Sequence, residues 1–396
     1  MGAVLDIDAL LGDPQTRIIV CCGAGGVGKT TTAAALGLRA AESGRRVVVL
    51  TIDPARRLAQ SLGLTTLDNT PRPVGNIDSA GGGSLDAMML DMKRTFDEVV
   101  EAHSTPEKAA QILANPFYQA VSSSFAGTQE YMAMEKLGQL RLEADRDPDN
   151  PRWDLIVVDT PPSRSALDFL DAPKRLGSFL DGRFIRLLAA PAKAGGRAYL
   201  KVFSAGVNVA TKTLTKVLGG QMLSDVQTFV AALDTMFGGF RKRADHTYAL
   251  LSDRMTTFIV VAAPERDALR EASYFVDRLD EEQMPLAGLV VNRMYRVSAP
   301  GLSAARALGA AEALDDEDSG GPSGDASPKD PGRTPITQGL LRMHAIQAEI
   351  AARHESLAKR FVAGHPGIPM VEVPAASGDI HDLVGLRLVG NALAGS

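Results

Sequence analysis

Short, almost wholly apolar runs recur along the chain, and longer stretches with helical spacing separate them. An apolar run of about four to eight residues, rich in Val and Ile, is typical of a parallel strand buried on both faces. Strands that alternate with helices predict an α/β fold with a doubly wound, mostly parallel sheet. The predicted strands are 17–22, 46–50, 85–92, 153–160, 257–261, 287–292 and 368–373.

The helical stretches divide into two groups. Some connect successive strands, beginning at Lys29 and at about 265 and 335, and one closes the chain. The others, 93–150 and 165–251, form an inserted helical subdomain in which Pro106 and Asn115-Pro116 break the first part. The predicted nucleotide-binding core of this single domain comprises residues 15–92, 152–164, 255–296 and 335–396.

Residues 299–334 change composition abruptly. An acidic run, Asp315 to Asp318, is followed by Gly, Ser, Pro and Asp. The second half of this segment has too few apolar residues to bury the surface that would keep it ordered. We therefore expect a flexible surface insertion here, with no domain boundary.

Composition and charge exclude several functions. Of 396 residues, 45% are apolar and 22% charged, as in globular domains. The net charge of −5 does not indicate a basic surface of the kind that binds nucleic acid. The two cysteines, Cys21 and Cys22, cannot form a disulfide framework or a metal cage. The chain shows no signal peptide and no apolar run of about 18 residues, so we expect a cytoplasmic protein without direct membrane insertion.

One loop lies between the first predicted strand and the first helix. Residues 23–30 read G-x-x-x-x-G-K-T, the phosphate-binding pattern, in the strand–loop–helix context that it requires. Glycines let backbone N–H groups approach phosphate oxygens, and the helix start adds further N–H groups. Lys29 is expected to reach the β- and γ-phosphates and the Thr30 hydroxyl to bind Mg²⁺. The predicted ATP-binding residues are Gly25, Gly26, Val27, Gly28, Lys29, Thr30 and Thr31.

Two aspartates end neighbouring apolar runs. Asp53 follows the second strand and Asp159 the fourth, where ligands bind in open α/β sheets. Asp53 is predicted to orient or deprotonate the attacking water, although Asp53-Pro54 is also an ordinary helix start. Asp159 is predicted to lie near Mg²⁺ or the γ-phosphate, so Thr30, Asp53 and Asp159 form the expected metal set.

These motifs carry a resemblance. The chain resembles the ArsA/Get family of ATPases, part of a larger class that includes MinD, ParA and nitrogenase iron protein. Residues 23–31 resemble its deviant Walker A loop, 51–55 its switch I and 159–163 its switch II. The resemblance implies a dimer that closes on ATP. It also implies that Glu265 contacts the partner's nucleotide, Asn292 reads adenine, and Pro374 lies in the loop that packs on adenine.

The chain departs from the family at two places. Family members carry a lysine as the second loop residue, reaching across the dimer, and this chain has Ala24. Arg56-Arg57 also replaces the usual His-Asn or His-Ser. A trans-acting cation is worth roughly 10³–10⁵ in rate in other phosphoryl-transfer enzymes. We therefore expect weak activity alone and a heterodimer with a lysine-bearing paralogue, in the manner of an actinobacterial pair, with a homodimer as the alternative.

The sequence does not identify the cellular process that ATP hydrolysis would drive. The helices of 165–251 either pack on the sheet or present an apolar groove to a client protein segment. The first hypothesis is a targeting factor or chaperone for such segments. A MinD/ParA-like regulatory ATPase and a metabolic kinase or synthetase are the alternatives. An arsenite-efflux subunit is disfavoured, because the chain has only Cys21 and Cys22 as thiols.

Overall fold

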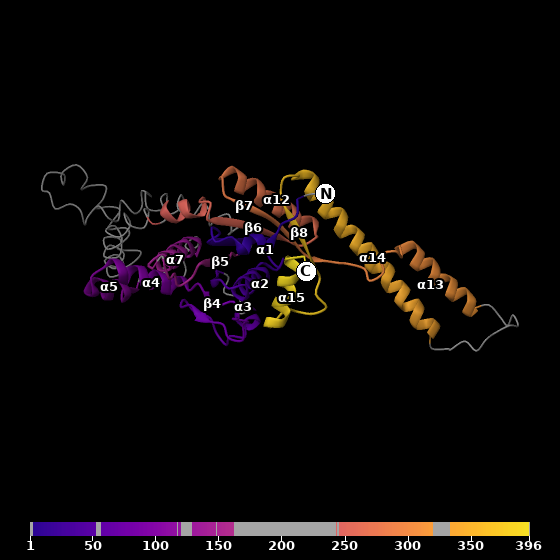
Figure 1. Cartoon of the computed structure of the whole chain (residues 1–396), viewed down its shortest axis with the longest axis horizontal. Coiled ribbons are helices and arrows are strands. Elements are labelled where there is room, and N and C mark those ends of the chain that lie inside the picture. Colours follow the sequence, from indigo (N-terminus) through magenta and orange to yellow (C-terminus); the bar gives the residue numbers. More distant parts are fainter. Residues whose placement is uncertain are drawn as a thin grey trace, which may run out of the picture.

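A single eight-stranded sheet forms the centre of the computed structural model, which describes residues 3–52, 57–116, 118–119, 129–147, 149–161, 243, 245–319 and 333–395. The strand order is β3-β4-β2-β5-β1-β6-β7-β8 (Figure 1). The strands are β1 (Ile18–Gly23), β2 (Arg46–Thr51), β3 (Arg72–Pro73), β4 (Ser84–Met89), β5 (Leu155–Asp159), β6 (Thr256–Ala262), β7 (Leu286–Met294) and β8 (Met370–Pro374).

Every ladder of this sheet is parallel except the one at its β3 edge. The predicted α/β fold with a doubly wound, mostly parallel sheet is therefore confirmed. The two-residue strand β3 lies in the connection between α3 and β4 and is not among the strands that the sequence predicts. Pro73 lacks a backbone N–H and is tolerated there because an edge strand leaves that position without a partner.

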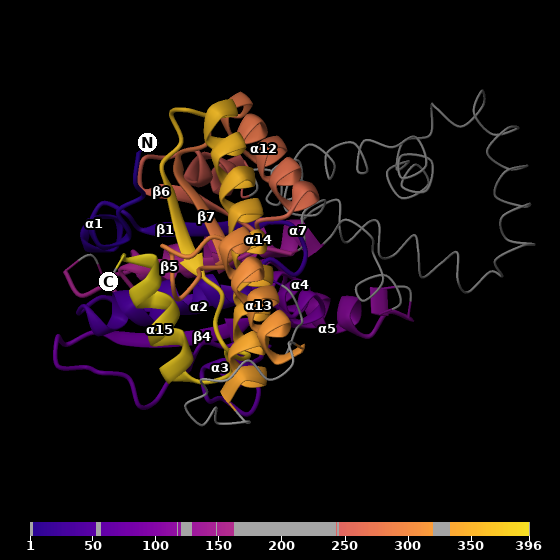
Figure 2. The same ribbon diagram turned by 90° about the vertical axis from the view of Figure 1, so that its right-hand side faces the viewer.

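The strands bury both faces, as their continuous apolar runs predict. Along β1, Ile18 and Val20 face one core and Ile19 faces the other, because successive side chains alternate across a strand. Helices cover each face (Figure 2). One layer is α1 (Ile7–Gly12), α2 (Lys29–Glu42), α3 (Arg57–Ser61) and α15 (Leu383–Leu393); the other is α4 (Met92–His103), α5 (Pro106–Leu113), α7 (Gln129–Ala144) and α12 (Arg266–Glu281).

Helix boundaries follow local capping chemistry. The Asp91 carboxylate accepts from the Arg94 N–H and starts α4, while Thr105 caps α5 with Pro106 in its first turn. The break predicted at Pro106 is thus confirmed. Of the predicted helical stretch 165–251, only residue 243 and residues 245–251 lie within the described chain. No helix in the part of the chain that the structure describes is long and apolar enough to cross a membrane.

Two long helices project from the body as a hairpin. α13 (Ala304–Ser319) packs along α14 (Arg333–Gly364), and together they extend well beyond the sheet (Figure 1). Residues 304–319 of the predicted insertion 299–334 are therefore helical, whereas residues 320–332 lie outside the described chain. Alanines favour this helix, and Ala307 and Ala311 are fully buried although they contribute little apolar area each.

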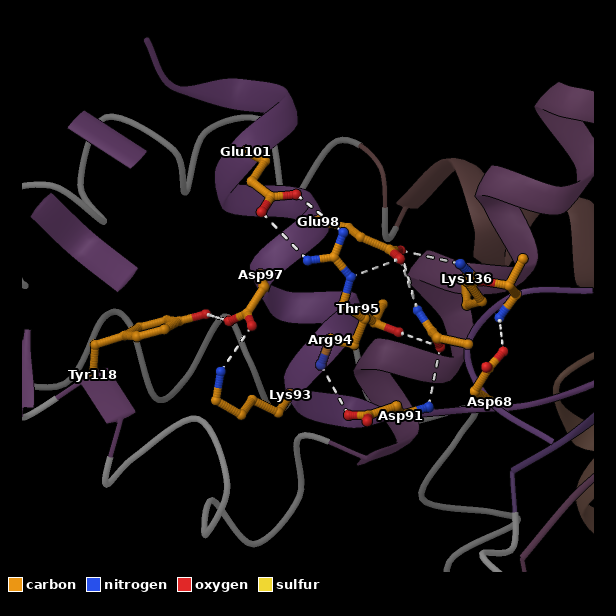
Figure 3. Close-up of polar contacts among 12 residues, drawn as sticks. Asp68, Asp91, Lys93, Arg94, Thr95, Asp97, Glu98, Glu101, Tyr118 and Lys136 are labelled. Carbon is orange, nitrogen blue, oxygen red and sulfur yellow. Dashed lines mark hydrogen bonds and ion pairs between the residues drawn. The ribbon is translucent and has the colours of Figure 1, made fainter. Parts of the chain in front are cut away.

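A polar network fixes the start of α4 (Figure 3). The Asn69 side chain, only 4% exposed, donates to both Glu98 carboxylate oxygens at 3.1 Å. Its oxygen accepts from the Asp91 N–H and the Thr95 hydroxyl, both at 3.0 Å. Lys136 of α7 then pairs with Glu98 at 3.0 Å. The Asn69 amide thus ties the segment before β3 to α4, and Glu98 extends the network to α7.

Replacing Asn69 by alanine is expected to lower the free energy of unfolding by about 2–4 kcal/mol, because the buried Thr95 hydroxyl and the partly buried Asp91 N–H lose their acceptor. Urea unfolding followed by circular dichroism measures the change. Arg72→Ala is the control: its partner Asp68 is exposed, so that loss stays within about 0–1 kcal/mol. Equal losses in the two variants would show that the network contributes no more than a surface ion pair.

Candidate nucleotide-binding site

The predicted phosphate loop lies at the carboxyl edge of the sheet, between β1 and α2. The chain runs from β1 to β2 on one side, whereas β6, β7 and β8 lie on the other. The carboxyl end of β1 is therefore a topological switch point, where open α/β sheets bind their ligands. Helix α2 begins at Lys29, so the N–H groups of its first turn and its positive dipole end face the loop.

Two loop glycines adopt backbone angles that side chains rarely tolerate. Gly26 has φ = 77° and Gly28 has φ = 98°. A Cβ on Gly28 would lie 2.3 Å from Nδ2 of Asn292, whereas one on Gly26 would meet nothing within 4 Å. Gly28 is thus required both for its conformation and for the close approach of a side chain from β7.

The loop's lysine and threonine are held by polar contacts. Lys29 Nζ donates to the Ala24 carbonyl at 2.8 Å, which folds the lysine back over the loop. The Thr30 hydroxyl donates to Asp159 Oδ2 at 2.7 Å, joining the start of α2 to the end of β5. The structure therefore brings Thr30 and Asp159 together, as the sequence predicted, and both offer oxygen ligands.

Two further threonines were missed in the sequence. The buried Thr51 hydroxyl donates to the same Asp159 oxygen at 2.9 Å, and the Thr160 hydroxyl donates to the Cys21 carbonyl at 2.9 Å. Both stand directly beside the predicted aspartates at strand ends, which is the signal that could have found them. They fix the Asp159 carboxylate and tie β5 to β1.

Asn292 contacts the phosphate loop. Its Nδ2 donates to the Val27 carbonyl at 2.9 Å, and its oxygen accepts from the Arg293 N–H at 2.9 Å. Arg293 has φ = 61°, an uncommon value for a side-chain-bearing residue, which marks a sharp local turn. The predicted role of Asn292 toward adenine remains a prediction, but its place beside the loop is observed.

Glu265 and Pro374 lie on the same edge of the sheet. Glu265 follows β6 and is exposed at the start of α12, where it makes no capping hydrogen bond through its side chain. Pro374 ends β8, and the next residue, Ala375, donates its N–H to the Met294 carbonyl of β7. Within the described chain, neither side chain is hydrogen-bonded to the loop.

Some of the remaining predicted site residues lie outside the part of the chain that the structure describes. Asp53 and Arg56 lie outside the described residues, as does the second half of the predicted switch II after Pro161. Ala24 is described: its methyl group is 8% exposed and belongs to the core cluster beneath the loop. A longer side chain at position 24 must therefore extend out of this cluster to reach a ligand.

The two thiols cannot act together. Cys21 and Cys22 are buried and belong to the cores on opposite faces of the sheet. Burial raises the pKa of Cys22 to about 12 and raises the pKa of Cys21 well above its usual range, an effect to which the Asp159 carboxylate adds. Both thiols therefore stay protonated at neutral pH.

Sequence comparisons with known proteins give a family and several relatives. A family model described as anion-transporting ATPase matches residues 16–300. Protein Rv2184c of Mycobacterium tuberculosis is 30% identical over 175 residues, covering 42% of this chain and 40% of that protein. ATPase GET3 of Podospora anserina is 23% identical over 290 residues, covering 73% and 76%. ATPase BagA of Mycobacterium tuberculosis is 26% identical over 167 residues, covering 42% and 48%.

The extent of these matches differs between proteins. The chain spans less than half the length of Rv2184c and of BagA but about three quarters of that of GET3. The family model, in contrast, covers most of the chain, from the residues before β1 to beyond β7. The resemblance drawn from the sequence motifs is thus confirmed, and the chain belongs to the anion-transporting ATPase family, which includes ArsA- and GET3-like proteins.

Proposed function

We propose that this chain binds ATP with Mg²⁺ and hydrolyses ATP to ADP and phosphate. The observation that carries the proposal is the pairing of the Thr30 hydroxyl with the Asp159 carboxylate beside the loop. A phosphate loop alone explains anion binding, whereas a hydroxyl and a carboxylate at its base supply oxygen ligands for a hard cation. The names of the ATPase relatives support the same activity.

The donor set fits Mg²⁺ bound together with the nucleotide. Within the described residues, no three His, Cys, Asp or Glu side chains gather into a metal site of their own. Mg²⁺ is typically bound by one or two carboxylates, waters and substrate phosphates, so Thr30 and Asp159 are sufficient protein ligands. When bound, Mg²⁺ neutralises charge on the phosphate oxygens.

The chain's own groups then bind and orient the triphosphate. The loop N–H groups and the start of α2 hold the phosphate oxygens, and Lys29 places its positive charge against the β- and γ-phosphates. Thr51 and Thr160 keep the ends of β2 and β5 in register with the loop. We assign to Asp53 the role of orienting the attacking water. Asp53 follows the carboxyl end of β2 in the sequence, and open α/β sheets bind their ligands at such strand ends.

Ala24 supports a heterodimer. The second loop position carries no charge in this chain, so a homodimer would lack a cation crossing from either side. A partner that bears lysine there would complete the site of this chain, while its own site would remain incomplete. The chain would hydrolyse ATP weakly alone, and Glu265 would face the partner's nucleotide.

The driven process is proposed from the resemblance to the ArsA/Get family and from the places of the two thiols. We favour a targeting factor or chaperone for apolar protein segments; a MinD/ParA-like regulatory ATPase is the alternative. Arsenite efflux is disfavoured, because Cys21 and Cys22 are buried on opposite faces of the sheet and stay protonated. Two such thiols cannot bind one arsenic atom together.

Replacing Asp159 by asparagine tests the proposed metal site. Asparagine keeps the size of the side chain but removes the charge, so the Mg²⁺ concentration needed for half-maximal ATP binding should rise about 10–100-fold. Titration of Mg²⁺ at fixed ATP with a fluorescent nucleotide measures this. Asp154→Asn is the control, since Asp154 pairs with Arg45 at the opposite edge of the sheet. An unchanged Mg²⁺ requirement would contradict the assignment of Asp159.

A further inference from the structure

Strand β7 carries one extra residue where it passes the phosphate loop. The ladder pairs on either side are Val291 with Glu372 and Met294 with Pro374. Between these pairs β7 advances three residues while β8 advances two. Arg293 lies in this interval with φ = 61°, a left-handed value that is uncommon for a residue with a side chain. Such a β-bulge re-aims a side chain, and bulges are frequent beside functional sites.

The side chain that lies in the bulge is Asn292, and it contacts the loop at two adjacent residues. Its Nδ2 donates to the Val27 carbonyl at 2.9 Å, while its oxygen accepts from the Arg293 N–H at 2.9 Å. The second bond fixes the orientation of the amide, because only the oxygen end accepts from an N–H. A Cβ on Gly28 would lie 2.3 Å from Nδ2, so the amide also lies directly against the loop backbone.

The bond to Val27 fixes the direction of a phosphate-binding group. The Val27 carbonyl and the Gly28 N–H belong to one planar trans peptide unit, so they point in opposite directions. A carbonyl held by Asn292 therefore turns the Gly28 N–H to the side away from β7. If this peptide unit rotated, its carbonyl oxygen would face the phosphates and repel them. Asn292 thus acts on phosphate through the loop, without contact with the ligand.

The neighbouring elements hold the bulge in place. The Met294 carbonyl accepts from the N–H of Ala375, which follows β8, at 2.9 Å. The Tyr295 N–H donates to His354 Nδ1 of α14 at 3.2 Å. Burial and the neighbouring Arg353 lower the pKa of His354, so its ring is neutral at neutral pH and Nδ1 accepts. Asn292 is therefore presented to the loop by a turn that is fixed from two sides.

From this geometry we propose that Asn292 is a positioning residue of the phosphate loop, which sets the Val27–Gly28 peptide for any triphosphate, whatever its base. The family resemblance implies only a contact with adenine, and a base contact has no effect on a ligand without a base. The Asn292 amide has a second N–H and a second lone pair, so one side chain has atoms for both roles. The inference rests on the proposed function only in that the loop binds phosphate.

Inorganic tripolyphosphate with Mg²⁺ is the probe, because it has the phosphate chain of ATP and no base. Calorimetric titration of the full chain should show its affinity fall about 3–10-fold in Asn292→Ala, the usual effect of one lost hydrogen bond. Asn391→Ala is the matched control. Asn391 is an exposed residue of α15 that accepts from Arg39 at 2.9 Å, roughly 15 Å along α2 from Lys29. Its loss should leave the affinity unchanged.

Two variants of Arg293 test the bulge while Asn292 stays in place. Proline cannot adopt φ = 61° and has no N–H for the Asn292 oxygen, so Arg293→Pro should weaken tripolyphosphate binding as much as Asn292→Ala does. Glycine keeps the N–H and adopts positive φ freely, so Arg293→Gly should cost at most about twofold. Thermal unfolding shows that each variant is folded. If Arg293→Pro does not fold, Asn292→Ala and Arg293→Gly decide the question.

The outcomes separate this inference from the proposed function. Tripolyphosphate affinity that is unchanged in Asn292→Ala but lost in Lys29→Ala would reject the positioning role and leave the phosphate loop standing. Equal losses in Asn292→Ala and Asn391→Ala would also reject it. A loss in Arg293→Gly as large as in Asn292→Ala would assign the affinity to the guanidinium instead of the bulge. An unmodified chain that binds neither ATP nor tripolyphosphate would overturn both proposals together.

Discussion

Replacing Ala24 by lysine is expected to raise ATP turnover by the purified chain by on the order of 10³-fold, if two copies of the chain can face each other. The expectation follows from the missing charge: each copy would gain an ammonium that reaches the other's phosphates. Phosphate release at saturating ATP and Mg²⁺ measures the change. Because the Ala24 methyl group is largely buried, the lysine stem must lie along apolar surface with its ammonium outside.

Ala24→Met separates charge from packing. Methionine fills the same space as the lysine stem without an ammonium, so its turnover should stay at the level of the unmodified chain. Thermal unfolding of both variants shows whether the longer side chain disturbs the core. Equal turnover of the unmodified chain and Ala24→Lys, with both proteins folded and dimeric, would mean that position 24 does not limit hydrolysis. The heterodimer proposal would then fail.

Replacing Lys29 by alanine is expected to weaken ATP binding by on the order of 10²-fold and to remove detectable hydrolysis. Lys29 is the cation of the loop that this chain itself supplies, and its Nζ is held against the Ala24 carbonyl at 2.8 Å. Loss of a charge that contacts phosphate costs binding and transition-state stabilisation together. Calorimetric titration with ATP and Mg²⁺ measures the affinity.

The control for Lys29 is Lys359→Ala. Lys359 is an exposed lysine of α14 that pairs with Glu355, four residues away, at 3.3 Å, so its loss should leave ATP affinity unchanged. Lys29→Arg adds a second comparison, since the planar guanidinium keeps the charge but does not fit the space of an ammonium. ATP affinity that survives in Lys29→Ala would place the triphosphate elsewhere in the molecule.

The parts of the fold that the sequence predicts well are those encoded locally. The strand before Gly23 and the helix from Lys29 follow from an apolar run and a glycine-rich loop, and both form as predicted. Asp159 was found because it ends such a run. The family resemblance, drawn from the same short motifs, is confirmed by the family model.

The parts that the sequence missed depend on contacts between distant segments. Thr51 binds Asp159 across 108 positions, and although its place at a strand end near Asp53 makes it a candidate, nothing local shows that it contacts the aspartate of another strand. The sequence did not predict helix α13, because this helix packs on α14, a contact that the composition of residues 299–334 does not reveal. The contact between Asn292 and Val27 likewise requires β7 to lie near β1 in the folded sheet.

The base of α14 lies next to the loop that follows Asn292. Tyr295 donates its backbone N–H to His354 Nδ1 at 3.2 Å, and the two rings meet edge to face. Roughly 27 Å of helix separates His354 from Ile336 at the outer end of α14. A tilt of about 10° around His354 therefore displaces Ile336 by about 5 Å. A small movement of the turn beside the phosphate loop would thus become a displacement the size of a side chain at the tip of the hairpin.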